Sequence, residues 1–181
     1  GLGDVYKRQV LRQTTARLPW LLIGMIGGIG NSMILGNFDS TFAAHPEMAL
    51  YIPLIGGTGG NVGTQSSAII VQGLANSSLD AKNTFKQITK ESVVALINAT
   101  IISLLVYTYN FIRFGATATV TYSVSISLFA VVMFASIFGT LVPMTLEKFK
   151  IDPAIATGPF IAITNDIIGM MLYMGITVLL S

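Results

Sequence analysis

Five long apolar stretches, separated by short polar breaks, dominate this sequence. They cover residues 19–42, 48–74, 92–114, 121–146 and 153–180. Each stretch reaches the ~20 residues that a helix needs to cross the ~30 Å hydrocarbon core of a bilayer. Only 10% of the 181 residues are charged, against about a quarter in a typical soluble domain. Period-two alternation and recurrent hairpin turns are missing. The sequence therefore predicts an all-α membrane protein with five transmembrane helices.

Lysine and arginine are distributed unevenly among the polar breaks. Nine of the ten lie before the first stretch, between the second and third, or between the fourth and fifth, whereas the tenth, Arg113, lies at the end of the third stretch beside the following break. The nine-charge side is expected to be cytoplasmic, which places the N-terminus inside and, after five spans, the C-terminus outside. Residues 1–16 are interpreted as a basic flank (a cloning scar, an ordinary positive flank or an interfacial helix), and residues 17–181 as the transmembrane domain.

The second stretch contains an unusual run of small and polar residues, "PLIGGTGGNVGTQSS" at 53–67. Its five glycines remove side chains and expose backbone carbonyls. Neutral oxygens and amides accompany them, from Thr58, Asn61, Thr64, Gln65, Ser66 and Ser67. At membrane depth such a run is tolerated only where it is buried in protein or lines water. Neutral oxygens suit the passage of a hydrated cation, while close helix packing would explain the glycines but not Asn61 and Gln65.

One acidic residue is expected deep inside a span. Asp152 followed by Pro153 predicts the start of the last helix, and Asp166 lies about thirteen residues into the stretch, roughly 20 Å along at 1.5 Å per residue. A carboxylate near the bilayer centre costs at least ~2.5–3.5 kcal/mol. A bound cation, a wet cavity or protonation would compensate; a neutral aspartic acid satisfied by a neighbouring helix is the alternative. Because no span offers a basic partner, a cation site is favoured.

The neighbours of Asp166 are small or polar. Ala162 and Gly169 lie three or four residues away on the same helix face, Asn165 precedes the carboxylate, and Thr157 and Gly158 lie about two turns earlier. Small residues on this face let another helix approach or leave room for a hydrated ion. The pattern is compatible with both.

Several segments together resemble the transmembrane domain of the MgtE magnesium channel family, which is related to the animal SLC41 carriers. They are "RLPWLLIG" entering the first stretch, "FDSTF" at its end, "YIPLIGGTGGNVGTQSSAIIVQGLA" in the second and "DPAIATGPFIAITNDIIGMMLYMGI" in the last. The resemblance covers nearly all residues from Arg17 onward. Family members typically carry cytosolic domains ahead of the first span, and the resemblance does not extend to those domains.

The resemblance implies a homodimer with five helices per subunit and an ion path on the two-fold axis. It also implies that Asp166 is the metal ligand. The expected pore-lining residues are Gly60, Asn61, Gly63, Thr64, Gly158, Ala162, Asn165 and Gly169.

The sequence and the resemblance together predict a channel that passes hydrated Mg²⁺ down its electrochemical gradient. Residue spacing alone does not distinguish Mg²⁺ from Mn²⁺, Co²⁺ or Ca²⁺ at the same site, and the resemblance favours magnesium. The alternatives are a carrier coupled to Na⁺ or H⁺ and a non-transporting membrane subunit. No catalytic motif is found, so the chain is not expected to be an enzyme. No basic patch interleaved with aromatic residues indicates a nucleic-acid partner. The chain is assigned to a bacterial or archaeal plasma membrane.

Overall fold

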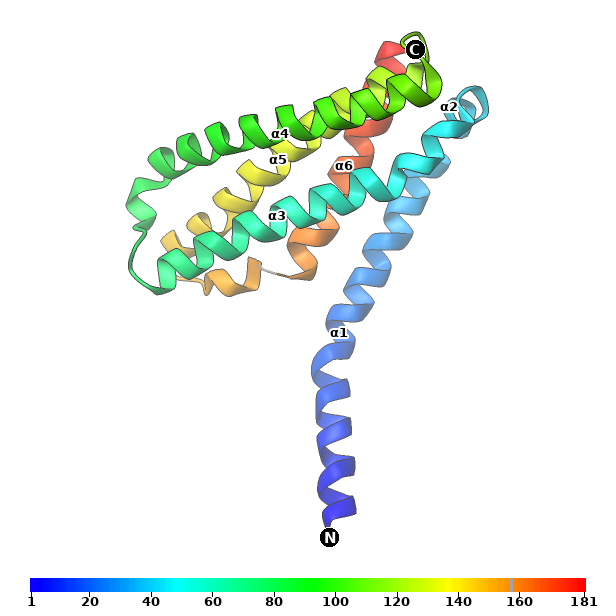
Figure 1. Cartoon of the computed structure of the whole chain (residues 1–181). Coiled ribbons are helices and arrows are strands. Elements are labelled where there is room, and N and C mark those ends of the chain that lie inside the picture. The colour runs from blue at the N-terminus through cyan, green and yellow to red at the C-terminus, as the bar shows by residue number, and fades with distance from the viewer. Residues whose placement is uncertain (157) are drawn as a thin grey trace.

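The computed structural model describes residues 1–156 and 158–181, which form helices and no β-strand. Five long helices make up most of this part (Figure 1): α1 (Leu2–Gly36), α3 (Ile52–Ala75), α4 (Thr84–Phe114), α5 (Thr119–Lys148) and α6 (Pro159–Leu180). Short elements join them: α2 (Asp39–Ala44) and the 3₁₀ turns η1 (Pro46–Tyr51), η2 (Ala81–Asn83) and η3 (Pro153–Ala156). The all-α expectation is confirmed for the residues described.

Four of the long helices in the described ranges, α1, α4, α5 and α6, are long and apolar enough to cross a membrane. The remaining long helix, α3, has 24 residues, which is enough to span the hydrocarbon core. Because of its glycine-rich polar run, α3 has no stretch as hydrophobic as those of the other four and is not among the helices that are apolar enough to count as spans. The membrane class of the fold is supported, and a fifth span through α3 stays a prediction.

Helix α5 lies at the centre of the bundle and packs against α3, α4 and α6. Many of its buried positions carry Ser, Thr, Ala or Gly, and such small residues let neighbouring helices approach closely in a membrane. Helix α1 packs mainly on α6 and has no buried residue. Its N-terminal half extends away from the other helices (Figure 1). The basic flank is thus helical and continues into the first apolar stretch without a break.

An apolar core fills the end of the bundle near α2 and η1. It comprises Met48, Tyr51, Ile55, Val120, Val124, Leu128, Val131, Met170, Tyr173 and Met174. Two buried hydrogen bonds brace it: the Tyr173 hydroxyl donates to the Met48 carbonyl at 2.7 Å, and the Tyr51 hydroxyl donates to Asn110 Oδ1. The connection between α1 and α3 is therefore held against both α6 and α4.

The last long helix begins later than the sequence predicts. Asp152 does cap a turn, because its Oδ1 accepts the N–H of Ala154 at 3.0 Å, but that turn is only η3. Gly158 then adopts φ +152°, a conformation that favours glycine, and Pro159 opens α6, where its fixed φ suits the first helical position. The prediction of a start at Pro153 is wrong.

This later start changes the depth of Asp166. The residue lies seven positions beyond Pro159, about 10 Å along the helix at 1.5 Å per residue, rather than roughly 20 Å. Asp166 therefore lies in the first half of α6, nearer to its middle than to its η3 end. Other boundaries also differ: the first stretch is broken after Gly36, and α4 starts at Thr84 instead of near residue 92.

Candidate functional site

Helices α3 and α6 pack side by side and carry an open groove of about 470 Å³. Most of its lining comes from α3, with residues Gly56, Gly57, Gly60, Asn61, Thr64, Gln65 and Ala68. Helix α6 contributes Ala162 and Asp166. The groove brings together the glycine-rich run and the carboxylate that the sequence singles out.

The α3 side of the groove follows from residue spacing. Two rows at four-residue intervals form it, Gly56–Gly60–Thr64–Ala68 and Gly57–Asn61–Gln65, because residues four apart lie on one face of a helix. Every member is small or neutral and polar. This wall therefore offers backbone, hydroxyl and amide groups and carries no charge.

The only ionisable residue among those that line the groove is Asp166. Its side chain faces α3 so closely that a Cβ on Gly56 would lie 3.4 Å from Asp166 Oδ1. The residue is partly exposed. In the described part of the chain, the carboxylate has no cationic partner and accepts no hydrogen bond. A partly desolvated carboxylate without a partner is unfavourable in a membrane. Asp166 is therefore a strong candidate for a ligand of a cation.

Three of the predicted lining residues lie inside the subunit instead. Asn165 is 1% exposed, and its amide fits the space left by Gly63, where a Cβ would overlap Nδ2. Gly63 also meets α5, since a Cβ on Gly139 would lie 2.6 Å from the Gly63 carbonyl oxygen. Gly169 is buried against Val131 and Ile55. These positions allow α3, α5 and α6 to pack closely and do not line the groove.

The predicted set is thus divided between two faces. Gly60, Asn61, Thr64, Ala162 and Asp166 share the groove. Gly158 lies ahead of α6 and is not among the lining residues, and Thr157 lies outside the described residues. The prediction omitted Gly56, Gly57, Gln65 and Ala68. Four-residue steps from Gly60, Asn61 and Thr64 would have found them.

One chain supplies few charged ligands for a metal ion. Within residues 1–156 and 158–181, no group of three Asp, Glu, His or Cys side chains is arranged to hold a metal. The groove provides one carboxylate and several neutral oxygens. This donor set suits a hard cation, which prefers oxygen ligands and keeps part of its water shell.

Residues 52–176 match the MgtE family model, described as a divalent cation transporter. This region begins with α3 and contains both walls of the groove. The chain belongs to the MgtE family of divalent cation transporters. The resemblance inferred from the sequence motifs is therefore confirmed.

The named relatives of this MgtE chain are magnesium transporters. The chain is 32% identical over 160 residues to the magnesium transporter MgtE of Bacillus subtilis. The matched region is 88% of this chain and 35% of the relative. The protein of the same name from Thermus thermophilus is 32% identical over 91% of this chain and 36% of its own length. The magnesium transporter MgtE of Enterococcus faecalis is 29% identical over 97% of this chain and 40% of its own length. The chain spans little more than a third of these relatives.

Proposed function

We propose that this MgtE chain passes hydrated Mg²⁺ down its electrochemical gradient through a dimeric pore in which Asp166 is the central ligand. The observation that carries the proposal is the unpartnered carboxylate in an open groove that is otherwise uncharged. The family description supports a divalent cation as the cargo. The names of the relatives favour magnesium.

A second copy of the chain would complete the site. The groove of one subunit is open on one side and provides a single carboxylate. Mg²⁺ requires near-octahedral oxygen coordination and releases its water reluctantly. Two Asp166 carboxylates across a two-fold axis would hold such an ion through its waters, and the opposed grooves would enclose a path lined by both α3 helices. The pore on the axis is part of this proposal.

The neutral wall of α3 has a defined role in this mechanism. The oxygens of Asn61, Thr64 and Gln65 accept hydrogen bonds from the water shell of the ion, and they do so without the strong attraction that a further carboxylate would add. Conduction requires binding that is weak enough for the ion to leave. Selection then depends on the size and geometry of the hydrated ion, so Mn²⁺, Co²⁺ and Ca²⁺ are expected to compete with Mg²⁺.

The distribution of basic residues supports an N-terminus in the cytoplasm. The membrane potential then drives cations inward with ~2.3 kcal/mol per unit charge per 100 mV. For a divalent ion the free energy gained on moving inward is twice as large, so no coupling ion is needed for uptake.

A liposome flux assay tests the proposal. Asp166→Asn keeps the shape of the side chain and removes its charge; Asp152→Asn makes the same change in an exposed loop. We expect Mg²⁺ uptake to fall at least tenfold in Asp166→Asn and to change less than twofold in Asp152→Asn. Undiminished uptake by Asp166→Asn contradicts the role of the carboxylate. Flux that requires a Na⁺ or H⁺ gradient contradicts the channel mechanism and supports a coupled carrier.

A further inference from the structure

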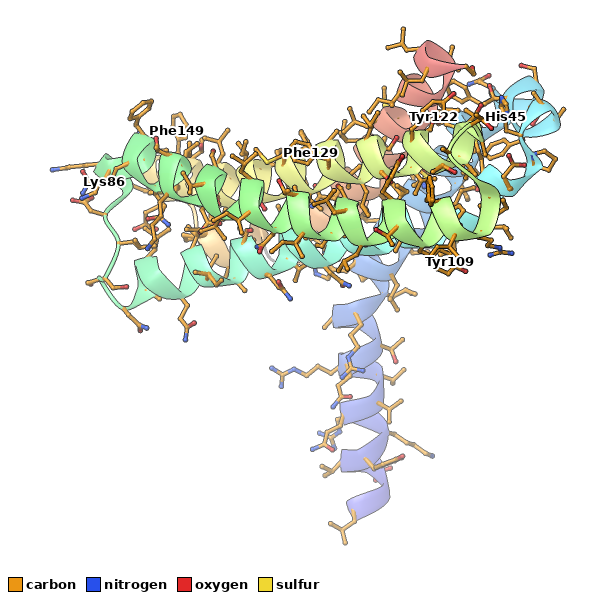
Figure 2. All side chains as sticks on the ribbon, turned by 45° about the horizontal axis from the view of Figure 1, so that its top comes forward. His45, Lys86, Tyr109, Tyr122, Phe129 and Phe149 are labelled. Atoms are coloured by element: carbon orange, nitrogen blue, oxygen red, sulfur yellow. The ribbon has the colours of Figure 1, made fainter. Side chains whose placement is uncertain are left out.

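A second polar pocket lies away from the groove, where the loop between α3 and α4 meets the end of α5. Its volume is about 230 Å³. The lining residues are Ser78, Leu79, Asp80, Asn83, Lys86, Gln87, Lys90 and Met144. Figure 2 shows Lys86 at this end of the bundle, near Phe149 and far from His45 and Tyr122. The proposed transport mechanism uses none of these residues.

The charged groups of the pocket favour an anion. Lys86 and Lys90 are one helical turn apart and lie on the same face. Neither forms a close ion pair with a carboxylate, since the ion pair found in the described ranges joins the N-terminal amine to Asp4; Lys90 interacts with the neighbouring Glu91 only electrostatically, at longer range. Asp80 also lines the pocket, but its Oδ1 accepts the backbone N–H of Lys82 at 3.0 Å. Two ammonium groups thus line the pocket together with one carboxylate that already caps a turn.

A glutamine adds a hydrogen-bond donor to the two lysines. Gln87 lies between them on α4 and lines the pocket, with only 9% of the residue exposed. Its side-chain amide makes no hydrogen bond to another group in the described part of the chain, and its nitrogen and oxygen are not fully buried. The amide is therefore accessible from the pocket, where an anion would accept a hydrogen bond from it and interact with the two charges.

An exposed apolar stripe continues from the lysines along α4. Steps of three or four residues lead from Lys86 and Lys90 to Val93, Ile97, Ile101 and Leu104, each of the four at least half exposed. These steps follow the helical repeat, so the six residues form one ridge. Two exposed aromatic side chains, Phe85 and Phe149, lie at the same end of the bundle. The surface thus combines two cationic side chains at one end of α4 with a continuous exposed apolar stripe along the helix.

We propose that this pocket binds the phosphate of an anionic phospholipid, with an acyl chain lying along the α4 stripe. Lys86 and Lys90 contact the phosphate, and Gln87 donates a hydrogen bond to it. Basic pockets at the ends of membrane helices bind anionic head groups in this way. A free phosphate would use the lysines but not the stripe, so the two ligands are distinguishable. The proposal is independent of Asp166 and of the direction of transport.

Lipid retention by the detergent-purified full chain, measured by native mass spectrometry, tests the proposal. We expect phosphatidylglycerol to be retained at least tenfold more tightly than phosphatidylcholine. The double variant Lys86→Gln/Lys90→Gln should lose this preference. The control Lys148→Gln/Lys150→Gln makes the same charge change at the same end outside this pocket, and it should keep the preference within twofold.

Two further measurements keep the test sharp. Gln87→Leu should weaken phosphatidylglycerol retention severalfold while size-exclusion chromatography shows a folded protein. Inorganic phosphate at the same concentration should displace little lipid. Equal retention of the two lipids, an equal loss in the control variant, or full displacement by inorganic phosphate would each overturn the proposal.

Discussion

Gly63 on α3 leaves a notch in the helix surface, and the side chain of Asn165 on α6 fills this notch. A Cβ on Gly63 would overlap the Asn165 amide and come within 3.1 Å of Ile161. The fit fixes how α6 is rotated against α3. Because successive helical residues point about 100° apart, burying Asn165 against Gly63 turns Asp166 toward the groove.

Replacing Gly63 should therefore destabilise the bundle. In Gly63→Ala the added methyl group meets the buried Asn165 side chain, and overpacking of this kind typically costs about 1–3 kcal/mol. Thermal unfolding in detergent measures the effect. The matched control is Gly60→Ala, on the other face of α3, where a Cβ meets nothing within 4 Å. Equal melting temperatures for the two variants would show that the notch does not constrain packing.

Filling the groove should block transport without unfolding the protein. Gly60→Val places a branched side chain in the open groove, and valine is no worse than glycine in a helix. We expect Mg²⁺ flux to fall at least tenfold with an unchanged melting temperature. Gly24→Val adds the same volume on α1, where space is also open, and should leave flux within twofold. If both variants conduct normally, the groove is not the path.

The hydroxyl of Tyr173 should stabilise the end of the bundle near η1. It donates a buried hydrogen bond to the Met48 carbonyl, so Tyr173→Phe leaves that carbonyl without this donor and should cost about 1–3 kcal/mol. Differential scanning fluorimetry would detect the lower melting temperature. Tyr122→Phe removes a longer, exposed bond to the Leu180 carbonyl at 3.3 Å and should have little effect. A stable Tyr173→Phe variant would mean that the η1 connection is held by apolar packing alone.

The sequence predicts the helices well because long apolar stretches have few alternatives to a membrane helix. It fails at Pro153, where a good capping pair opens only a short turn and the long helix starts after Gly158, at Pro159. The choice of Asp166 as a candidate site residue follows from chemistry that the sequence displays directly, because a lone carboxylate in an apolar stretch is costly wherever the helix ends lie.

The rotation of the helices could not be predicted in the same way. Glycines occur on two faces of α3: Gly56 and Gly60 line the groove, whereas Gly59 and Gly63 pack against α5 and α6. Both faces look alike in the sequence, because small residues serve close packing and an open path equally well. Which face packs is decided by the side chains on the neighbouring helices, and the side chain that packs on Gly63 is the buried Asn165.

The stoichiometry of metal binding tests the central claim most directly. Mn²⁺ can replace Mg²⁺ as a spectroscopic probe, and its binding to the detergent-purified chain can be counted by electron paramagnetic resonance titration. A site shared by two Asp166 carboxylates predicts one Mn²⁺ per two chains at the tightest site, lost in Asp166→Asn and retained in Asp152→Asn. One Mn²⁺ per chain, or a tight site that survives Asp166→Asn, would contradict the account.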